Sequence, residues 1–144
     1  MYSSLTQVGA PVTMRGWRQF LGVPYRHLGR TKRGLDCYGL LLLYAKNILN
    51  VELPDWWYEK DWEKRGNDYF TENYQGYAYR VERPEIHDVI LFCTDRDVRI
   101  PNHCGILVKQ PDLFLQATYD GVMTSSLYND VFRNRIEGFY RVKR

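Results

Sequence analysis

The stretch that most constrains the fold is Gly34-Leu35-Asp36-Cys37-Tyr38-Gly39, with the apolar run Leu40-Leu41-Leu42-Leu43-Tyr44 behind it. Asp36 is a favourable N-cap residue, because its carboxylate can accept from the free backbone N–H groups of a first helical turn. The residues through about Leu49 are mostly helix formers, and Asn50 is a suitable stop. Apolar residues surround this helix on most sides, so we expect it to be buried at the centre of the fold.

Cys37 stands at the first turn of this expected helix. The partial positive charge at a helix N-terminus stabilises a thiolate and lowers the pKa of the thiol. The thiolate is the form in which a cysteine attacks a substrate. A nucleophile of this kind works with a general base and with a third group that orients the base, so the rest of the sequence has to supply both.

Length and composition indicate one globular domain over residues 1–144, with 44% hydrophobic and 26% charged residues. The net charge of +3 is too small to indicate a nucleic-acid partner, and none is expected. Three cysteines, Cys37, Cys93 and Cys104, cannot all pair, which argues against a secreted disulfide scaffold. We see neither a signal peptide nor an apolar run near the roughly 20 residues that span a bilayer, so we expect synthesis in a cytoplasm and no membrane insertion.

The N-terminal part favours helices and the C-terminal part favours strands. Residues 1–13 are expected to form an extended arm, and the apolar spacing over 14–21 predicts a short helix. Turn residues separate five predicted strands, at 88–92, 103–108, 113–117, 121–124 and 139–142. Short connections imply antiparallel pairing, so the expected class is α+β, with the central helix packed on a C-terminal antiparallel sheet of about five strands.

The segment 55–83 is an aromatic-rich insertion that fits neither pattern. The spacing of Tyr58, Trp62 and Tyr69 predicts that part of it forms an amphipathic helix. One interpretation is a lid packed over the core. The other is that some of its aromatic side chains wall a binding groove or contact another protein.

The sequence has three histidines from which a general base can come, His27, His87 and His103. His103 opens a predicted strand, in which alternation puts Cys104 on the opposite face. If the sheet packs on the central helix, His103 can face Cys37 while Cys104 points away. On the next strand Gln116 is the one polar residue in an apolar run, and it is suited to orient His103 as the third member of a triad.

This order of features resembles the NlpC/P60 family of cell-wall cysteine peptidases. The resemblance covers about residues 14 to 128. The matching stretches are Gly22-Val23-Pro24-Tyr25, Asp36-Cys37-Tyr38-Gly39-Leu40, Val51-Glu52-Leu53-Pro54, Asp88-Val89-Ile90-Leu91-Phe92, His103-Cys104-Gly105-Ile106 and Leu115-Gln116-Ala117.

The resemblance implies a papain-like fold and a cysteine endopeptidase that commonly cuts the γ-D-glutamyl–diaminopimelate bond of peptidoglycan stem peptides. Cys37 would be the nucleophile, His103 the general base, and Gln116 the orienting residue where the family has His, Asn or Gln. The backbone N–H of Cys37 would form part of the oxyanion hole. Tyr25 would line the site, and Asp36 would bind a polar group of the substrate besides capping the helix.

The sequence departs from the family pattern at three places near the site. Tyr38 follows the nucleophile where the family usually has Ser, and we expect it to narrow the pocket as part of the substrate-binding or oxyanion region. His27-Leu28-Gly29 stands where Trp-Gly-Gly is common, and Ile86-His87 replaces Pro-Gly. These departures concern specificity more than mechanism.

The resemblance also implies partners and alternatives. It points to the tail-associated members found in phages, prophages and gene-transfer particles, with bacterial peptidoglycan and other tail proteins as partners and no cofactor. The protein would be part of a virion or tail particle and act at the cell wall or periplasm. The alternatives are a structural tail-tip or hub subunit with little activity, and an acyltransferase or amidase using the same thiol.

Structural roles are expected for the remaining cysteines and for the basic cluster. A zinc site from Cys37, Cys93, His103 and Cys104 lacks the usual ligand spacing, so no metal is expected. Cys93 and Cys104 are predicted to be small core residues on strands. The basic cluster Arg30-Thr31-Lys32-Arg33 is expected to be a solvated loop, with contact to anionic wall polymer or a partner as the alternative.

Overall fold

The computed structural model describes residues 16–144, so the expected arm over 1–13 and the start of the helix expected over 14–21 lie outside the described residues. The described part of that helix is a single 3-10 turn, η2 (Trp17–Phe20). A two-stranded hairpin follows, formed by β1 (Arg30–Thr31) and β2 (Gly34–Leu35). Within 16–144, no helix has the length and apolar character needed to cross a membrane.

The central helix forms where the sequence predicts it. Helix α2 (Cys37–Tyr44) is capped by Asp36, whose side chain accepts from the Gly39 N–H at 2.8 Å. The helix continues as one π-helical stretch, η3 (Ala45–Leu49). It ends at Asn50, which adopts the left-handed conformation (φ 57°, ψ 39°) that asparagine tolerates better than most residues. The predicted cap and stop are both confirmed.

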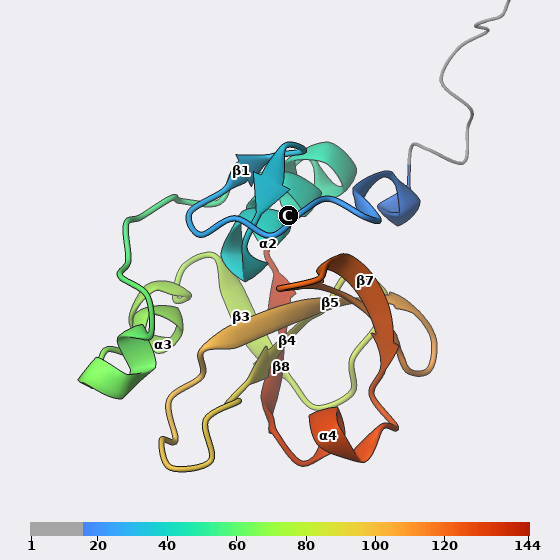
Figure 1. Cartoon of the computed structure of the whole chain (residues 1–144). Helices are drawn as coiled ribbons and strands as arrows, with labels where there is room; N and C mark the ends of the chain where they lie inside the picture. The colour runs from blue at the N-terminus through green and yellow to red at the C-terminus, as the bar shows by residue number, and fades with distance from the viewer. Residues whose placement is uncertain (1–15) are drawn as a thin grey trace, which may run out of the picture.

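The C-terminal half forms one antiparallel sheet (Figure 1). Its strands are β3 (Ala78–Val81), β4 (Val89–Phe92), β5 (His103–Lys109), β6 (Leu113–Thr118), β7 (Gly121–Ser126) and β8 (Ile136–Val142). Their order in the sheet is β3-β8-β4-β5-β6-β7, and every neighbouring pair is antiparallel. Five correspond to predicted strands, whereas β3 comes from the aromatic-rich segment and brings the count to six. The short helix α4 (Asp130–Arg133) connects β7 to β8.

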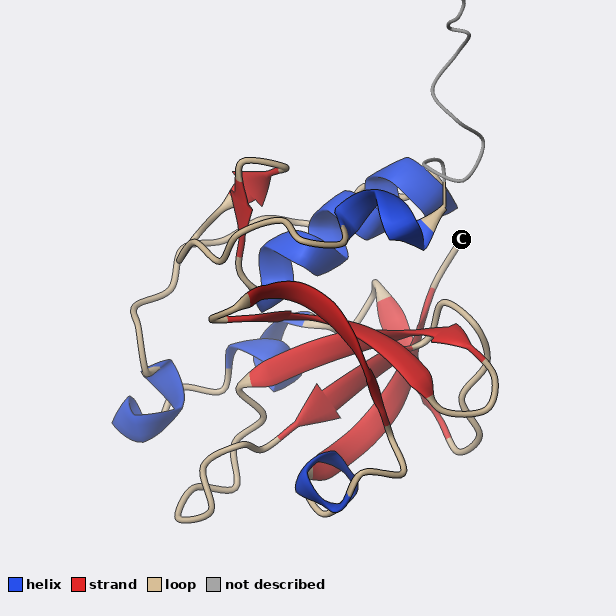
Figure 2. Cartoon of the chain, turned by 45° about the vertical axis from the view of Figure 1, so that its right-hand side comes forward, coloured by secondary structure: helices blue, strands red, loops and turns tan. Residues whose placement is uncertain are grey.

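Helix α2, which begins at Cys37, and its continuation η3 lie in a layer against one face of the sheet, as Figure 2 shows. Leu40, Leu41 and Tyr44 of the central helix pack there with residues from the strands, including Leu91, Ile106, Leu115 and Ala117. A second cluster fills the other face, where Phe92, Leu107 and Phe114 are buried and Phe132 of α4 packs against them. The helix is therefore held by burial of apolar side chains, as its composition predicts.

The expected orientation of strand β5 is wrong in one respect. Its alternation is as predicted, but Cys104 and Ile106 lie in the cluster that contains the central helix, and Leu107 lies in the other cluster. Cys104 therefore points toward Cys37 instead of away from it, and its thiol donates to the Cys37 carbonyl oxygen at 3.3 Å. His103 still interacts with Cys37, because both residues are the first of their elements and meet at the end of the strand.

The segment 55–83 folds into two short helical turns and strand β3, instead of one amphipathic helix. The turns are η4 (Trp62–Arg65) and α3 (Tyr69–Asn73). Tyr58, Trp62 and Phe70 are buried in the main core, as the lid interpretation expects. Residues 58–64 also line the groove that contains Cys37. The segment therefore both covers the core and forms part of a groove wall.

Candidate active site

Cys37 lies at the N-terminal end of α2, in a setting that favours its thiolate. The pKa of the Cys37 thiol is lowered to about 5, chiefly by the Cys104 thiol, whose one proton can be shared between the Cys37 sulfur and the Cys37 carbonyl oxygen, with the hydrogen bond and charge of His103 adding to this effect. Burial and the Asp36 carboxylate act in the opposite direction and are outweighed. At neutral pH the Cys37 side chain is therefore an anion poised next to an imidazole.

His103 is held from its far side by Gln116. The Nε2 atom of His103 lies 2.9 Å from Oε1 of Gln116, and Nε2 of Gln116 donates to Oγ of Ser125 at 2.8 Å. Because the amide nitrogen is engaged by Ser125, the amide oxygen faces the ring and accepts from Nε2–H, which leaves Nδ1 for Cys37. Burial lowers the pKa of His103, but its contacts with Cys37 and Gln116 outweigh burial and raise that pKa above its ordinary value.

Cys104 is a second thiol in contact with the Cys37 residue. It is buried, and burial raises its pKa well above the ordinary value, with the hydrogen bond and charge of Cys37 acting in the same direction. Cys104 therefore stays protonated and acts as a donor while Cys37 is ionised. Cys93 follows strand β4, is only partly buried, and has a pKa raised chiefly by burial.

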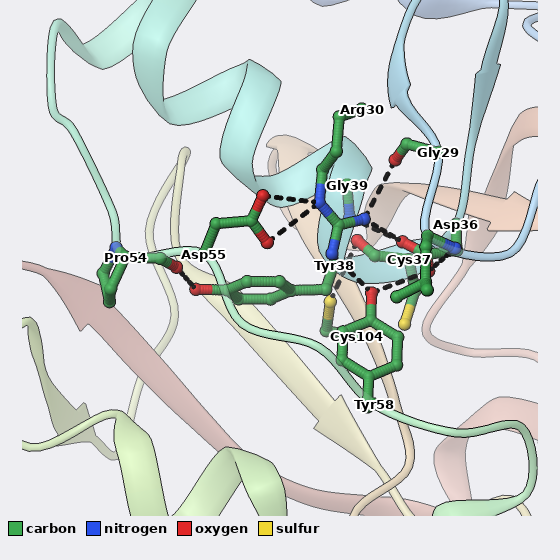
Figure 3. A network of polar contacts seen from close by, with 11 residues as sticks. Gly29, Arg30, Asp36, Cys37, Tyr38, Gly39, Pro54, Asp55, Tyr58 and Cys104 are labelled. Carbon is green, nitrogen blue, oxygen red and sulfur yellow. Dashed lines mark hydrogen bonds and ion pairs between the residues drawn. The ribbon is translucent and has the colours of Figure 1, made fainter.

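Asp36 is buried and is saturated by the protein's own donors (Figure 3). Its Oδ1 accepts from the Gly39 N–H and from Arg30, at 2.8 and 3.0 Å. Its Oδ2 accepts from the Leu28 N–H and the Tyr58 hydroxyl, at 2.8 and 2.6 Å. A carboxylate has about four acceptor positions, so the Asp36 cap also connects the β1 loop and the aromatic-rich segment to the start of α2, next to Cys37. Its predicted contact with substrate stays a prediction.

Arg30 lies at the centre of the network in Figure 3. The expectation that the basic cluster is a solvated loop is therefore wrong for Arg30. Its guanidinium pairs with Asp36 and Asp55 at 3.0 and 3.1 Å. It also donates to the Gly29 carbonyl and to the Tyr58 hydroxyl, each at 3.0 Å. A planar, always charged guanidinium suits such a multiple contact better than a lysine ammonium.

The two tyrosines predicted near the nucleophile behave differently. Tyr25 lines the groove and packs edge-on against Tyr119, with ring centroids 4.7 Å apart. Tyr38 does not line the groove: it is buried, donates from its hydroxyl to the Pro54 carbonyl, and packs against Trp56. The expected narrowing of the pocket by Tyr38 is therefore wrong, because the helix turns this side chain into the core.

A groove of about 830 Å³ runs past these groups. Cys37, His103 and Gln116 all line it, and so do Tyr25 and Asp36. Its walls come from residues 58–64, from the β4–β5 connection at 94–97, and from the α4 region. A thiol, an imidazole and an amide that bonds the imidazole thus share one cleft that is large enough for a peptide, an arrangement that suits nucleophilic catalysis.

Sequence reasoning missed three contributors to this site: Arg30, Tyr58 and Ser125. Arg30 lies six positions before Asp36, in a cluster that looks solvated, and nothing in its local pattern indicates a buried partner. The spacing of Tyr58 predicts a place on an amphipathic helix or in a groove wall, but not the hydrogen bond from its hydroxyl to Asp36. Ser125 was detectable in principle, because it lies on the strand that pairs with the Gln116 strand.

Among residues 16–144, no group of three His, Cys, Asp or Glu side chains is arranged to hold a metal ion.

Comparison with known families and structures agrees with this geometry. The model of the NlpC/P60 family matches residues 22–141. The chain belongs to the NlpC/P60 family. The resemblance inferred from the sequence is thereby confirmed. The matched region begins later than the expected stretch from 14 to 128, and it extends further, into strand β8.

Three curated proteins illustrate the range of its relatives. The tail tip assembly protein K of Escherichia phage lambda is 27% identical over 127 residues, covering 85% of this chain and 62% of that protein. The probable peptidoglycan endopeptidase LytE of Bacillus subtilis is 27% identical, covering 86% of this chain and 32% of that protein. A probable endopeptidase of Haemophilus influenzae is 29% identical, covering 96% of this chain and 79% of that protein. The chain thus spans less than two thirds of the first two relatives.

Solved structures share the fold. A lipoprotein-like NLP/P60 family protein from Staphylococcus aureus superposes with a TM-score of 0.65 at 18% identity, covering 88% of this chain and 38% of that one. The NlpC/p60 domain of the peptidoglycan hydrolase SagA gives 0.58 at 15% identity, covering 88% and 92%. The fold class expected from the sequence is therefore confirmed, with six strands in place of about five.

Proposed function

We propose that the chain is a cysteine endopeptidase that hydrolyses peptidoglycan stem peptides. The observation that carries the proposal is the set of Cys37, His103 and Gln116 in one groove, with the pKa of Cys37 lowered to about 5 and that of His103 raised. A thiolate–imidazolium pair of this kind is suited to acyl transfer. Membership of the NlpC/P60 family and two relatives named as probable endopeptidases support the substrate class.

In the proposed reaction the Cys37 thiolate attacks the carbonyl carbon of the scissile amide. A carbon–sulfur bond forms while the carbonyl electron pair moves onto oxygen. The Cys37 backbone N–H, at the first helical position, has no hydrogen-bond acceptor within residues 16–144 and can donate to that oxyanion. Each such donor contributes about 3 kcal/mol to transition-state stabilisation.

The intermediate then collapses, and the carbon–nitrogen bond breaks. The His103 imidazolium gives its proton to the leaving amine, and a thioester to Cys37 remains. Neutral His103 next takes a proton from water as the water attacks the thioester. The carbon–sulfur bond breaks, which returns the thiolate and the imidazolium. Gln116 and Ser125 keep the ring in one tautomer through both halves of this cycle.

The finer part of the proposal concerns the bond and the place of action. We infer the γ-D-glutamyl–diaminopimelate bond as the target and a phage-like tail as the carrier, with other tail proteins as partners. The similarity to the lambda tail tip assembly protein supports the carrier. On such a particle the enzyme would open the wall locally during entry, at the cell wall or periplasm.

The same similarity favours one alternative, a structural tail-tip subunit with little or no activity. The two functions differ in what the nucleophile contributes. If the role is purely structural, Cys37→Ala supports tail assembly and infection as well as the wild type does. If the role is enzymatic, particles with Cys37→Ala assemble but lose infectivity on cells with intact walls.

The direct test is digestion of purified peptidoglycan followed by mass analysis of the released muropeptides. We expect the wild type to release stem-peptide fragments whose new ends identify the bond, and Cys37→Ala to release none. Cys93→Ala is the matched control, since that cysteine lies outside the groove and should leave release unchanged. Equal release by wild type and Cys37→Ala would overturn the assignment.

A further inference from the structure

Glu63 is a buried carboxylate for which the described part of the chain, residues 16–144, supplies no partner. Four polar or charged side chains are buried in the described residues: Asp36, Glu63, Asp88 and Gln116. Asp36 and Gln116 are hydrogen-bonded as described above, and Asp88 is held by two bonds from Arg141. Within residues 16–144, the Glu63 side chain, whose residue is only 6% exposed, has neither a hydrogen bond nor an ion pair.

Glu63 lines the same groove as Cys37. Of the carboxylates in the neighbouring wall, Glu59 is already occupied, since it accepts from Asn67 and from the Tyr69 hydroxyl at 3.1 and 2.8 Å. Asp36 is saturated by its four donors. Among the groove carboxylates in residues 16–144, Glu63 alone is both buried and unengaged.

Burying a carboxylate away from water without a hydrogen bond costs free energy. A ligand that donates hydrogen bonds to this carboxylate offsets that cost when it binds. The protein's own cations do not do this: Lys60 and Lys64 line the same wall, but both are exposed and neither pairs with Glu63 in the described residues. An ammonium group of a ligand offers three donors and a full opposite charge.

We propose that Glu63 binds an ammonium group of the substrate and thereby selects stem peptides that carry one. The inference rests on the proposed function, because it assigns the groove to a stem peptide. Two groups have the required chemistry: the free amino terminus of the peptide and the ω-amine of its diamino acid. Either would place a positive charge against Glu63, the one buried carboxylate of the groove that has no donor within residues 16–144.

Binding to protein that cannot turn over the ligand tests this inference. The probes are a synthetic tripeptide, L-Ala-γ-D-Glu-diaminopimelate, and two versions acetylated at either the amino terminus or the ω-amine. Dissociation constants are measured by calorimetry for full-length Cys37→Ala protein, with and without Glu63→Gln. We expect one of the two acetylations to weaken binding about tenfold when Glu63 is present, and to change nothing in Glu63→Gln protein.

The affected peptide identifies the source of the ammonium group. Glu59→Gln in the same background is the matched control and should keep the discrimination, because its carboxylate is already engaged within the protein. Glu63→Gln should leave the free energy of unfolding unchanged or higher, since the carboxylate has no bond within the described residues to lose. The inference is overturned if the tripeptide does not bind, if neither acetylation matters, or if Glu63→Gln keeps the discrimination. Failure of the proposed catalysis is distinguishable, because it leaves this binding preference intact while wild-type protein releases no fragments.

Discussion

A Cβ atom placed on Gly39 would lie 1.9 Å from the carbonyl oxygen of Gly29. The backbone before β1 therefore crosses the first turn of α2 at a distance that only glycine allows. This crossing also brings the Leu28 N–H to Asp36, next to Cys37.

We expect Gly39→Ala to lower the free energy of unfolding by about 3 kcal/mol, because backbone on both sides has to move. Denaturant unfolding measures the change. Gly16→Ala is the control, since a Cβ there meets nothing within 4 Å and should have little effect. An alanine at 39 that leaves the unfolding midpoint unchanged would contradict this close crossing.

The ionisation of Cys37 can be followed by alkylation. A pKa lowered to about 5 means that the thiolate dominates above that pH, so iodoacetamide should modify Cys37 rapidly at pH 6 to 7. Cys93, whose pKa is raised, should react slowly in the same sample. Mass spectrometry of the labelled peptides separates the two.

His103→Ala removes a hydrogen bond and a charge that lower the pKa of Cys37, so the pH profile of Cys37 alkylation should move to higher pH in this variant. A wild-type profile centred near 8.5, the value of an ordinary thiol, would exclude the pair.

The same ionisations define the pH range of activity. In the proposed reaction the reactive form carries a Cys37 thiolate and a His103 imidazolium, and the two groups titrate as a pair. Activity should rise with pH through about 5, as the thiolate forms, and fall where His103 loses its proton, above its ordinary pKa. The dependence of kcat/KM on pH measures both limbs. A profile without an alkaline limb would argue against an imidazolium in the reactive form.

Cys104 gives a further prediction, which does not involve His103. Its hydrogen bond is the largest cause of the lowered pKa of Cys37. Cys104→Ala should therefore raise the pKa of Cys37 and reduce its alkylation rate at pH 6, while Cys93 labelling stays the same. Cys104→Ser, which keeps a donor, should preserve more of the wild-type rate. If alanine and serine give the wild-type profile, the Cys104 thiol has no influence on the nucleophile.

Ser125 is expected to act on the reaction through Gln116. Ser125→Ala removes the bond that fixes the amide orientation, and should lower kcat about three- to tenfold with little change in KM. Gln116→Leu removes the orienting group itself and should lower kcat about 100-fold. The KM and the alkaline limb of the pH profile provide a second readout, because a change in folding alone would not shift that limb. A Ser125→Ala enzyme with the wild-type kcat and alkaline limb would show that Gln116 orients the ring unaided.

Local chemistry explains what the sequence could predict. The Asp36 cap, the Asn50 stop and five strands depend on residues close in the chain, and all of them form as expected. Strand β3 has no buried residue and pairs with β8 alone at the edge of the sheet, so its pattern carries little hydrophobic signal.

The errors at the site come from long-range packing. The alternation in β5 predicts which residues share a face, but not which face packs against the helix. For this reason the side of the strand predicted for Cys104 is wrong. Tyr38 was assigned to the groove from its neighbour in sequence, although one residue along a helix rotates a side chain by about 100°. The role of Arg30 depends on packing that joins it both to Asp36, six positions later, and to Asp55 on the aromatic-rich segment.

The junction at Asp36 has a consequence for how such domains can be recombined. Tyr58 joins Asp36 from the aromatic-rich segment, while Asp55 of the same segment holds Arg30. Transplanting residues 55–83 from a relative into this chain would thus exchange two members of the nucleophile's scaffold together with the groove wall. A chimera should keep the activity only if the donor segment has a hydroxyl at position 58 and a carboxylate at position 55. The insertion and the β1 loop would therefore have to be exchanged together.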